Sequence, residues 1–269
     1  MMVRWHIIAL ACLIGASAAA QTTPLRKLET EYSAQIWRAV GRIDLGRGRG
    51  SCSGTLIAPD LVLTAAHCLY QPGTDKLFKP EDIVFHAGLR QGRAVASRRV
   101  KAAAPHEKFA PIDDLTALNV RHDVGLLRLA EPIPSHEIPS FKLHRGRVEP
   151  GPVSVVSYGR GRNETQSHQK ECQITERLDE ILFFDCEAVP GTSGAPVFSH
   201  QNGRGQILAV VSGGLMNADR RRTVGMLLPE RVEEVKRQLR IQVHGPVAQE
   251  RRLGVGTRSQ GGAKFIRSN

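Results

Sequence analysis

The sequence predicts an all-β protein, built as barrels or a sandwich, with a C-terminal helix. Short apolar segments recur along the chain, and turn residues interrupt them about every eight to twelve positions, the spacing typical of such folds. The 269 residues include 26 glycines and 15 prolines, which suits many tight turns. Near the C-terminal end the pattern changes, because Val232, Val235 and Leu239 recur with the period of a helix.

In the first half, the turn at Pro59 and Asp60 separates two predicted strands. Glycine and arginine alternate over residues 46–50, which we interpret as a turn because five residues are too few for a nucleic-acid-binding patch. Residues 70–82 are predicted to form a loop and residues 104–121 a longer irregular connection. The predicted strands span residues 37–45, 52–58, 61–64, 83–88, 94–100 and 124–129.

Pro132, Pro134 and Pro139 mark an extended linker over roughly residues 131–147, where the first half ends. The second half repeats the pattern of short strands, and Pro229 then opens the helix. The predicted strands of this half span residues 153–158, 171–175, 181–186, 195–199, 207–212 and 226–228.

The two ends of the chain differ from the predicted barrels. Residues 1–20 have the features of a secretory signal peptide, with Arg4, an apolar run and three small residues before Gln21, so we expect a secreted or periplasmic protein. Residues 21–36 are either an N-terminal arm or a short pro-segment. Residues 245–269 are rich in Gly, Arg and Ser without periodicity, which predicts a disordered basic tail.

Apolar residues make up 41% of the chain and charged residues 23%, values typical of a globular protein with a core. The formal net charge is +11, which fits either a soluble basic exported protein or one attracted to acidic surfaces. Much of the excess lies in residues 220–222, the helix and the tail, outside any known nucleic-acid motif, so we expect no specific nucleic-acid partner. Beyond the signal peptide, no segment is apolar enough for a transmembrane helix.

Five cysteines are present, and Cys12 lies inside the predicted signal peptide. An even number of cysteines in an exported chain predicts disulfides. The residues themselves leave three pairings open among the remaining four. These are Cys52, Cys68, Cys172 and Cys186.

Three short motifs present the side chains of a nucleophilic hydrolase. His67 follows a predicted strand, Asp123 precedes a continuous apolar strand, and Ser193 lies in a Gly-Thr-Ser-Gly turn. A serine hydroxyl is a poor nucleophile at neutral pH and needs a base held in one tautomer. Histidine titrates near neutrality, and a carboxylate can orient it, so these residue types together suit acyl transfer.

The order His67, Asp123, Ser193 and the surrounding residues resemble the chymotrypsin/trypsin-like serine proteases. The chain is most similar to their bacterial branch, which includes the V8-like glutamyl endopeptidases. The resemblance implies two six-stranded Greek-key β-barrels with the site between them and a C-terminal helix on the second barrel. The first barrel, residues 37–142, would carry His67 and Asp123; the second, with the helix, would span residues 143–244 and carry Ser193.

The family also implies how the site is completed. The backbone N–H groups of Gly191 and Ser193 occupy the positions of the oxyanion hole, where losing one donor typically costs about 10² to 10³ in rate. The resemblance pairs Cys52 with Cys68, which leaves Cys172 with Cys186. We expect that second disulfide to firm up the wall of the specificity pocket.

One position departs from the digestive enzymes of the family. There an aspartate precedes the nucleophile and pairs with the new N-terminus after zymogen cleavage, whereas this chain has Thr192. Threonine cannot form that ion pair, so we do not expect activation by that route.

Substrate preference is predicted from two segments. Residues Ser212, Gly213 and Gly214 match the stretch that pairs with an extended substrate, but glutamyl endopeptidases have a histidine just before this glycine pair, so glutamate preference is not supported. Glu187 lies six residues before Ser193, where trypsin has its pocket-base carboxylate. This predicts Arg or Lys at P1, the substrate residue before the cleaved bond. The alternative is that Glu187 points elsewhere or to solvent.

We therefore predict a secreted or periplasmic serine endopeptidase that works through an acyl-enzyme, without metal or cofactor. We expect a monomer acting on protein or peptide substrates. One alternative is a protease-fold binding protein with little activity, which the complete triad argues against. The other is a serine esterase, although Ala195 stands where the Gly-x-Ser-x-Gly elbow has its last glycine.

Overall fold

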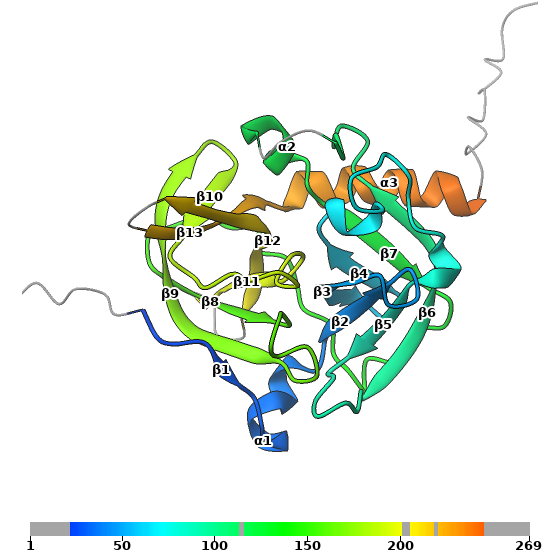
Figure 1. The fold of residues 1–269 in the computed structure, drawn as a ribbon, viewed down its shortest axis with the longest axis horizontal. Coiled ribbons are helices and arrows are strands. Elements are labelled where there is room, and N and C mark those ends of the chain that lie inside the picture. The colour runs from blue at the N-terminus through cyan, green and yellow to red at the C-terminus, as the bar shows by residue number, and fades with distance from the viewer. Residues whose placement is uncertain (1–21, 113–115, 201–204, 218–219, 245–269) are drawn as a thin grey trace, which may run out of the picture.

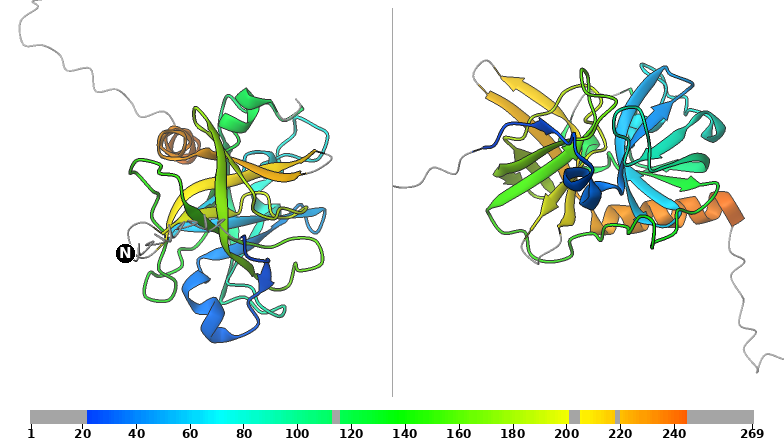
Figure 2. Two further views of the ribbon diagram at one scale, coloured as in Figure 1. Left: turned by 90° about the vertical axis from the view of Figure 1, so that its left-hand side faces the viewer. Right: turned by 90° about the horizontal axis from the view of Figure 1, so that it is seen from below.

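The structure is a computed structural model that describes residues 22–112, 116–200, 205–217 and 220–244. Two closed six-stranded antiparallel barrels lie side by side (Figure 1). The helix α3 (Pro229–His244) runs along one side of the pair (Figure 2). This arrangement confirms the predicted fold class. The predicted signal peptide and the predicted tail lie outside the described residues, and so does Cys12.

The first barrel closes in the order β2-β3-β4-β7-β6-β5, because β2 pairs with both β3 and β5. Pairing of β4 with β7 brings Thr64 opposite Gly125 at one end of the barrel. The strands are β2 (Val40–Leu45), β3 (Gly50–Ala58), β4 (Leu61–Thr64), β5 (Val84–Ala87), β6 (Ala96–Pro105) and β7 (Gly125–Leu129).

The second barrel has the order β9-β10-β13-β12-β11-β8, and pairing of β8 with β9 closes it. The long strands β12 and β13 pair from Ala209 opposite Leu227 outward to Asn217 opposite Arg220. The strands are β8 (Pro152–Ser157), β9 (Ser167–Leu178), β10 (Ile181–Phe184), β11 (Pro196–Ser199), β12 (Gln206–Asn217) and β13 (Arg220–Leu227).

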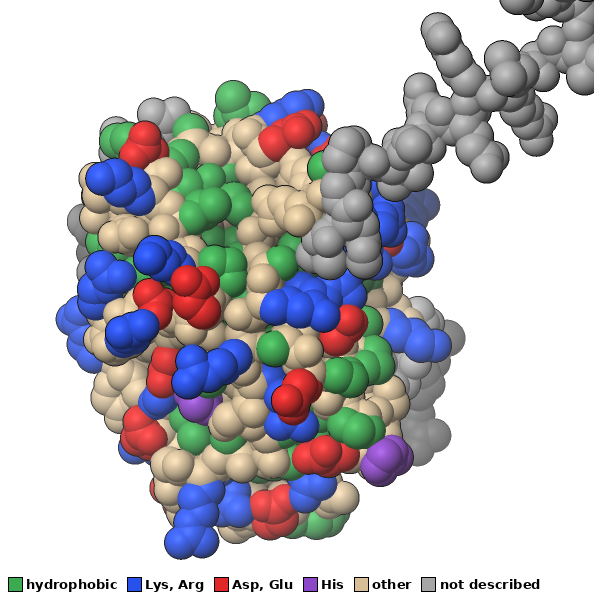
Figure 3. All heavy atoms as spheres, turned by 90° about the vertical axis from the view of Figure 1, so that its right-hand side faces the viewer, with side chains coloured by type: hydrophobic (Ala, Val, Ile, Leu, Met, Phe, Trp, Pro, Cys, Tyr) green, Lys and Arg blue, Asp and Glu red, His purple; other side chains and the backbone are tan. Residues whose placement is uncertain are grey.

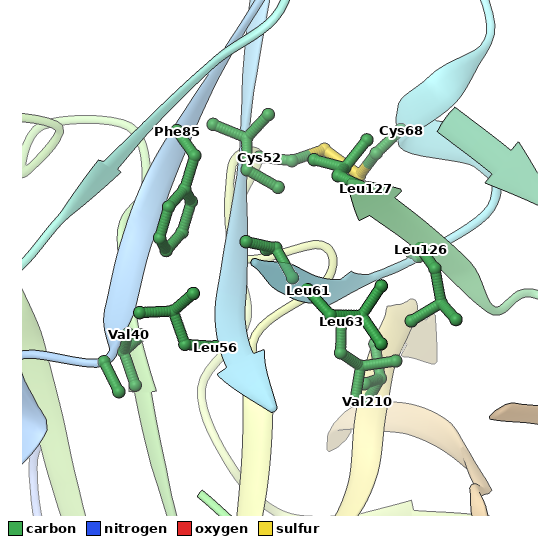
Figure 4. Packing of buried hydrophobic residues seen from close by; sticks show 14 of the residues in the cluster. Val40, Cys52, Leu56, Leu61, Leu63, Cys68, Phe85, Leu126, Leu127 and Val210 are labelled. Carbon is green, nitrogen blue, oxygen red and sulfur yellow. A yellow bond between two sulfur atoms is a disulfide. The ribbon is translucent and has the colours of Figure 1, made fainter. Parts of the chain in front are cut away.

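The core forms where the inward side chains of the strands meet. Figure 4 shows Phe85, Leu56 and Leu63 of the first barrel in one buried cluster with the Cys52–Cys68 disulfide, and Val210 of the second barrel lies beside Leu63. All four of these apolar side chains are fully buried. Because residues of both barrels share one apolar cluster, the barrels are joined by burial of hydrophobic surface.

Several elements differ from the prediction. The strands β9, β12 and β13 extend further than the apolar pattern indicated, since a backbone hydrogen-bond ladder continues through polar residues such as the exposed Arg177 and the half-buried Arg222. The connection predicted to be irregular contains the end of β6 and a short helix, α2 (Ala117–Arg121). Thr116 caps this helix by accepting the backbone N–H of Asn119.

The segment predicted to be an arm or pro-segment is built into the second barrel. Its strand β1 (Arg26–Lys27) pairs with the edge of β9, and α1 (Glu31–Ala34) follows. Leu28 is buried, and Trp37 lies with its ring centroid 5.0 Å from that of Phe198. The described part of this segment therefore packs on the second barrel and contributes to the core.

The helix α3 packs mainly against β6 and β7 of the first barrel, so its expected position on the second barrel is wrong. The helix starts beside the second barrel, where Arg231 pairs with Glu180 at 2.7 Å. It then crosses to the first, where Glu234 pairs with the buried His106 at 2.6 Å. No helix in the described ranges is long and apolar enough to cross a bilayer.

Charged side chains of both signs are interspersed over the face of the molecule on the side of the first barrel (Figure 3). Ion pairs of this barrel join Arg128 to Asp60 and Arg47 to Asp82, each at 2.7 Å. The excess positive charge of the chain is therefore not gathered into one basic patch on this face.

Candidate active site

His67 and Asp123 lie together because the paired strands β4 and β7 bring their ends to the same place. His67 begins a short 3-10 turn (His67–Leu69) after β4, and Asp123 stands two residues before β7. Nδ1 of His67 lies 2.7 Å from Oδ2 of Asp123, and the backbone N–H of His67 donates to Oδ1 at 2.9 Å. The Asp123 side chain is 2% exposed and that of His67 is 36% exposed.

The environment of His67 favours its protonated form. Burial lowers the pKa of His67, but the charge of Asp123 and the hydrogen bond between them outweigh this, and the net pKa is raised above the ordinary value of 6.5. A histidine whose imidazolium is stabilised in this way is suited to accept a proton from a neighbouring hydroxyl.

Ser212 contributes a third hydrogen bond to Asp123. Its hydroxyl, on β12 of the second barrel, donates to Oδ2 at 2.5 Å. The sequence placed Ser212 in the stretch that pairs with substrate, and its side chain in addition binds the carboxylate of the first barrel. Asp123 therefore has both oxygens occupied and a fixed orientation.

Ser193 lies in a tight turn that only glycines at its flanks permit. Gly191 has a φ of 96° and Gly194 a φ of 78°. A Cβ atom at Gly194 would lie 2.2 Å from Oγ1 of Thr64, so the loop carrying Ser193 approaches the first barrel closely. Ser53 of that barrel donates its backbone N–H to the Ser193 carbonyl at 2.8 Å.

Ser193 is half-buried and lies at the barrel interface that also holds His67. In the described chain no hydrogen bond joins the Ser193 hydroxyl to the His67 ring, and Nε2 of His67 lies 3.8 Å from Sγ of Cys68.

The backbone around Ser193 presents two free donors. The Pro190 carbonyl accepts from the N–H of Arg160 at 2.8 Å, and the peptide that follows is trans, so the N–H of Gly191 points the opposite way. Among the residues described, neither the N–H of Gly191 nor that of Ser193 donates to another protein group. Both are available to an oxyanion.

Beside Ser193 lies a cavity of about 450 Å³. Gly213 and Gly214 form part of its wall, as the sequence predicted, and Arg222 and Thr223 of β13 contribute another part. Arg222 also pairs with Glu176 at 2.8 Å. The described lining consists of Ala188, Val189, Pro190, Thr192, Ser193, Val211, Gly213, Gly214, Arg222 and Thr223.

The expected role of Glu187 at the base of this pocket is wrong. Glu187 does not line the cavity, and its carboxylate accepts the backbone N–H of Leu25 at 3.2 Å. Its own N–H donates to Oε1 of Gln169, whose amide in turn donates to the carbonyl of Thr23. The N-terminal arm thus draws the Glu187 side chain away from the cavity, and the reason for expecting a basic P1 residue is removed.

Both expected disulfides are present. Cys52 and Cys68 are joined beside His67, and Cys172 of β9 is joined to Cys186 just after β10. The Cys186 carbonyl accepts the hydroxyl of Thr223, so the second disulfide touches a residue of the cavity wall.

A metal centre has little support in the described ranges. Cys52, His67 and Cys68 form the one group there with three potential ligand atoms close together. The two sulfurs are bonded to each other, and a disulfide does not offer the thiolates that bind metals.

Two residues of the site were missed by the sequence analysis. The Ser53 hydroxyl donates to the Gly191 carbonyl at 3.0 Å and accepts the N–H of Tyr158 at 2.9 Å, so it links both barrels to the loop. Arg162 donates to Oγ1 of Thr192 at 3.1 Å. Ser53 follows Cys52 directly, which is the only local signal; Arg162 lies in a loop with no sequence motif.

Solved structures of other proteins share this fold. A Glu endopeptidase matches with a TM-score of 0.66 at 16% identity, over 81% of this chain and 97% of that one. The protease Anisep from Arthrobacter nicotinovorans matches with a TM-score of 0.63 at 15% identity, over 80% and 99% of the respective chains. At these identities the likeness concerns the fold.

Among curated proteins, Serine protease 23 from Homo sapiens is 25% identical over 181 residues. The match covers 55% of this chain and 42% of the human protein. Serine protease 23 from Macaca mulatta is 24% identical over 174 residues, with the same coverages of 55% and 42%. The chain therefore spans less than half the length of these relatives. The trypsin-like peptidase domain model matches residues 52–210, more than half of the sequence, and the chain belongs to that family.

Proposed function

We propose that the protein is an exported serine endopeptidase that hydrolyses peptide bonds through an acyl-enzyme on Ser193. The observation that carries this proposal is the carboxylate–imidazole pair of Asp123 and His67 at the interface where Ser193 and two free backbone N–H groups meet. These parts together supply a nucleophile, a base and oxyanion donors.

In the acylation step, Nε2 of His67 takes the proton of the Ser193 hydroxyl while Oγ attacks the scissile carbonyl carbon. The carbonyl oxygen becomes an oxyanion and accepts hydrogen bonds from the backbone N–H groups of Gly191 and Ser193. The imidazolium, stabilised by Asp123, then gives its proton to the leaving nitrogen. The C–N bond breaks, the amine product departs, and the acyl group remains on Oγ.

Deacylation repeats the sequence with water in place of the serine hydroxyl. His67 takes one proton from the water as its oxygen attacks the acyl carbon, and the same two N–H groups hold the oxyanion. The bond to Oγ breaks, and Oγ receives the proton back from His67. The products are a carboxylic acid and the free enzyme, so atoms and charges balance without a cofactor.

An extended peptide fits the site better than a small ester. Gly213 and Gly214 lie at the rim of the cavity beside Ser193 and carry no side chains, so a substrate backbone can lie along them as an added strand. The cavity then receives one substrate side chain. This arrangement supports the endopeptidase over the esterase.

Export is supported by two observations. Residues 1–20 have the pattern of a signal peptide. The two disulfides, Cys52–Cys68 and Cys172–Cys186, are of a kind that persists in oxidising compartments. We place the protein in the periplasm or outside the cell, with proteins or peptides as its substrates.

Fluorophosphonate labelling of the purified protein with both disulfides formed tests the proposal. We expect one adduct, mapped by mass spectrometry to Ser193, and no adduct in Ser193→Ala. The same preparation is expected to cleave casein into peptides. A folded protein that forms no adduct would support the alternative of a binding protein, and an adduct with ester but no peptide hydrolysis would support the esterase.

A further inference from the structure

Arg162 is a half-buried cation directly behind the loop that carries Ser193. It lies in the connection after β8, and its Nη1 donates to the carbonyl and to the hydroxyl of Ser157 at 3.0 and 3.1 Å. Its Nη2 donates to Oγ1 of Thr192 at 3.1 Å. All three acceptors are neutral oxygens, so the guanidinium is not balanced by a carboxylate in direct contact.

Thr192 connects this guanidinium to the loop that bears Gly191 and Ser193, which we call the oxyanion loop. Its side chain is 1% exposed, and its Oγ1 also accepts the backbone N–H of Val189 at 3.1 Å. The Val189 carbonyl in turn accepts the N–H of Thr192 at 2.9 Å. Thr192 and Val189 are therefore joined by two hydrogen bonds within the oxyanion loop, and one of them uses the same hydroxyl that Arg162 binds.

The two loops are also in van der Waals contact, which leaves little room for movement. A Cβ at Gly191 would lie 2.9 Å from Cα of Gly159, and a Cβ at Gly159 would lie 3.0 Å from Nη2 of Arg162. The loop containing Gly159 and Arg162 thus forms the surface against which the oxyanion loop rests.

A guanidinium partly withdrawn from water, with neutral partners only, has a cost in stability, because no opposite charge in contact compensates the lost hydration. Burial lowers the pKa of Arg162 to about 10, and the more distant charge of Glu187 opposes that shift. Arg162 therefore stays charged at neutral pH. Of its three donated hydrogen bonds, two hold it to Ser157 and the third reaches Oγ1 of Thr192, between Gly191 and Ser193.

We propose that Arg162 is a positioning residue that holds the N–H groups of Gly191 and Ser193 in their oxyanion-binding orientation, acting through the Thr192 hydroxyl. The proposal rests on the peptidase function proposed above. It explains how an enzyme with threonine before its nucleophile forms its site without an ion pair from a new N-terminus. Because the oxyanion exists only in the reacting state, Arg162 acts on the rate of chemistry and hardly on binding.

The test is the rate of phosphonylation of Ser193 by a fluorophosphonate, which develops an oxyanion and does not depend on the P1 preference. Saturation kinetics separate the maximal inactivation rate from the half-saturating concentration. The variants are Arg162→Met, Arg162→Lys, Thr192→Val and the double variant Arg162→Met/Thr192→Val. Arg177→Met is the matched control, because Arg177 is an exposed arginine on β9 of the same barrel.

We expect Arg162→Met and Thr192→Val each to lower the maximal rate by about one to two orders of magnitude, below the loss of a whole oxyanion donor. The half-saturating concentration should stay within about twofold, as expected for an interaction made only in the transition state. The double variant should be no slower than the slower single variant, because both changes remove one interaction. Arg162→Lys, which keeps a charged donor, should recover part of the rate.

Thermal unfolding of every variant is recorded, and rates are measured well below the lowest midpoint. A folded Arg162→Met that reacts at the rate of the unsubstituted protein would overturn the proposal, as would losses that multiply in the double variant. If Arg162→Met does not fold, the maximal inactivation rate and the half-saturating concentration of Arg162→Lys are used in its place. Failure of the unsubstituted protein to label at Ser193 would instead overturn the peptidase function.

Discussion

The Ser212 hydroxyl donates to Oδ2 of Asp123 at 2.5 Å, so the carboxylate of one barrel is held by a side chain of the other. Asp123 precedes β7 in the first barrel, whereas Ser212 lies within β12 of the second. The same oxygen also faces Nδ1 of His67 at 2.7 Å. The relative position of the two barrels is thereby coupled to the orientation of the His67 imidazole.

Replacing Ser212 with alanine is expected to change both rate and pH dependence. The variant leaves Asp123 with only its two bonds to His67, and we expect kcat/KM to fall about tenfold, the effect of losing one hydrogen bond to a charged group. Without the Ser212 donor the Asp123 charge is less compensated and attracts the imidazolium more strongly, so the pKa of His67 should rise further above its ordinary value.

The sign of the pH effect follows from the role of His67 as a base. Only the neutral imidazole accepts a proton, so activity is lost as pH falls through the His67 pKa, which the structure places above 6.5. In Ser212→Ala this acid limb should move to higher pH, and Ser212→Thr, which keeps a hydroxyl, should restore it. A profile of kcat/KM against pH measures the shift; an unmoved or lowered limb contradicts the prediction.

Cleavage after Arg or Lys should not be preferred, because the described cavity lining contains Arg222 and no carboxylate. Arg222→Met removes this positive charge and should increase the share of cleavage after basic residues.

Glu187→Gln should leave the ranking of P1 residues unchanged, since Glu187 binds the N-terminal arm. Sequencing the products of a peptide library checks both, and a loss of basic P1 cleavage in Glu187→Gln would restore the role that the sequence suggested.

Removing the disulfide between Cys172 and Cys186 should affect stability and the pocket together. The two cysteines are 14 residues apart, and closing a loop of this size contributes about 3 kcal/mol, or roughly 6 to 12 °C in Tm for a chain of this size. Because Thr223 of the cavity wall bonds to the Cys186 carbonyl, we expect a higher KM as well. Calorimetry and kinetics of Cys172→Ala/Cys186→Ala measure the two effects. If Tm falls by the expected amount but KM is unchanged, the disulfide stabilises the fold without supporting the pocket.

Truncation distinguishes an integral arm from a removable pro-segment. A chain that starts at Glu29 lacks the pairing of β1 with β9 and the bond from Leu25 to Glu187. We expect it to have a lower Tm and lower kcat/KM than a chain that starts at Thr22, because the wall leading to the cavity loses its outer support. Higher activity in the shorter chain would show that the segment is inhibitory.

Much of the fold was predictable because its signals are local. Recurring short apolar segments and regular turns indicated the strands, and the periodic positions Val232, Val235 and Leu239 indicated α3. Strand ends were missed where polar residues such as Arg177 continue the ladder. The side of the molecule that α3 covers was also missed, because it is set by packing against β6 and β7 and by contacts such as His106 with Glu234, which lie far apart in the sequence.

The sequence by itself determined the fold class, the candidate nucleophile Ser193, and the residues His67 and Asp123, because each lies in a short motif whose chemistry is readable locally. Only the tertiary structure decided that Glu187 turns to the arm, that Arg222 faces the cavity, and that Ser53, Ser212 and Arg162 support the site. Those roles arise from contacts between segments distant in the chain, and the direction of a side chain across such a contact is set by packing of the whole molecule.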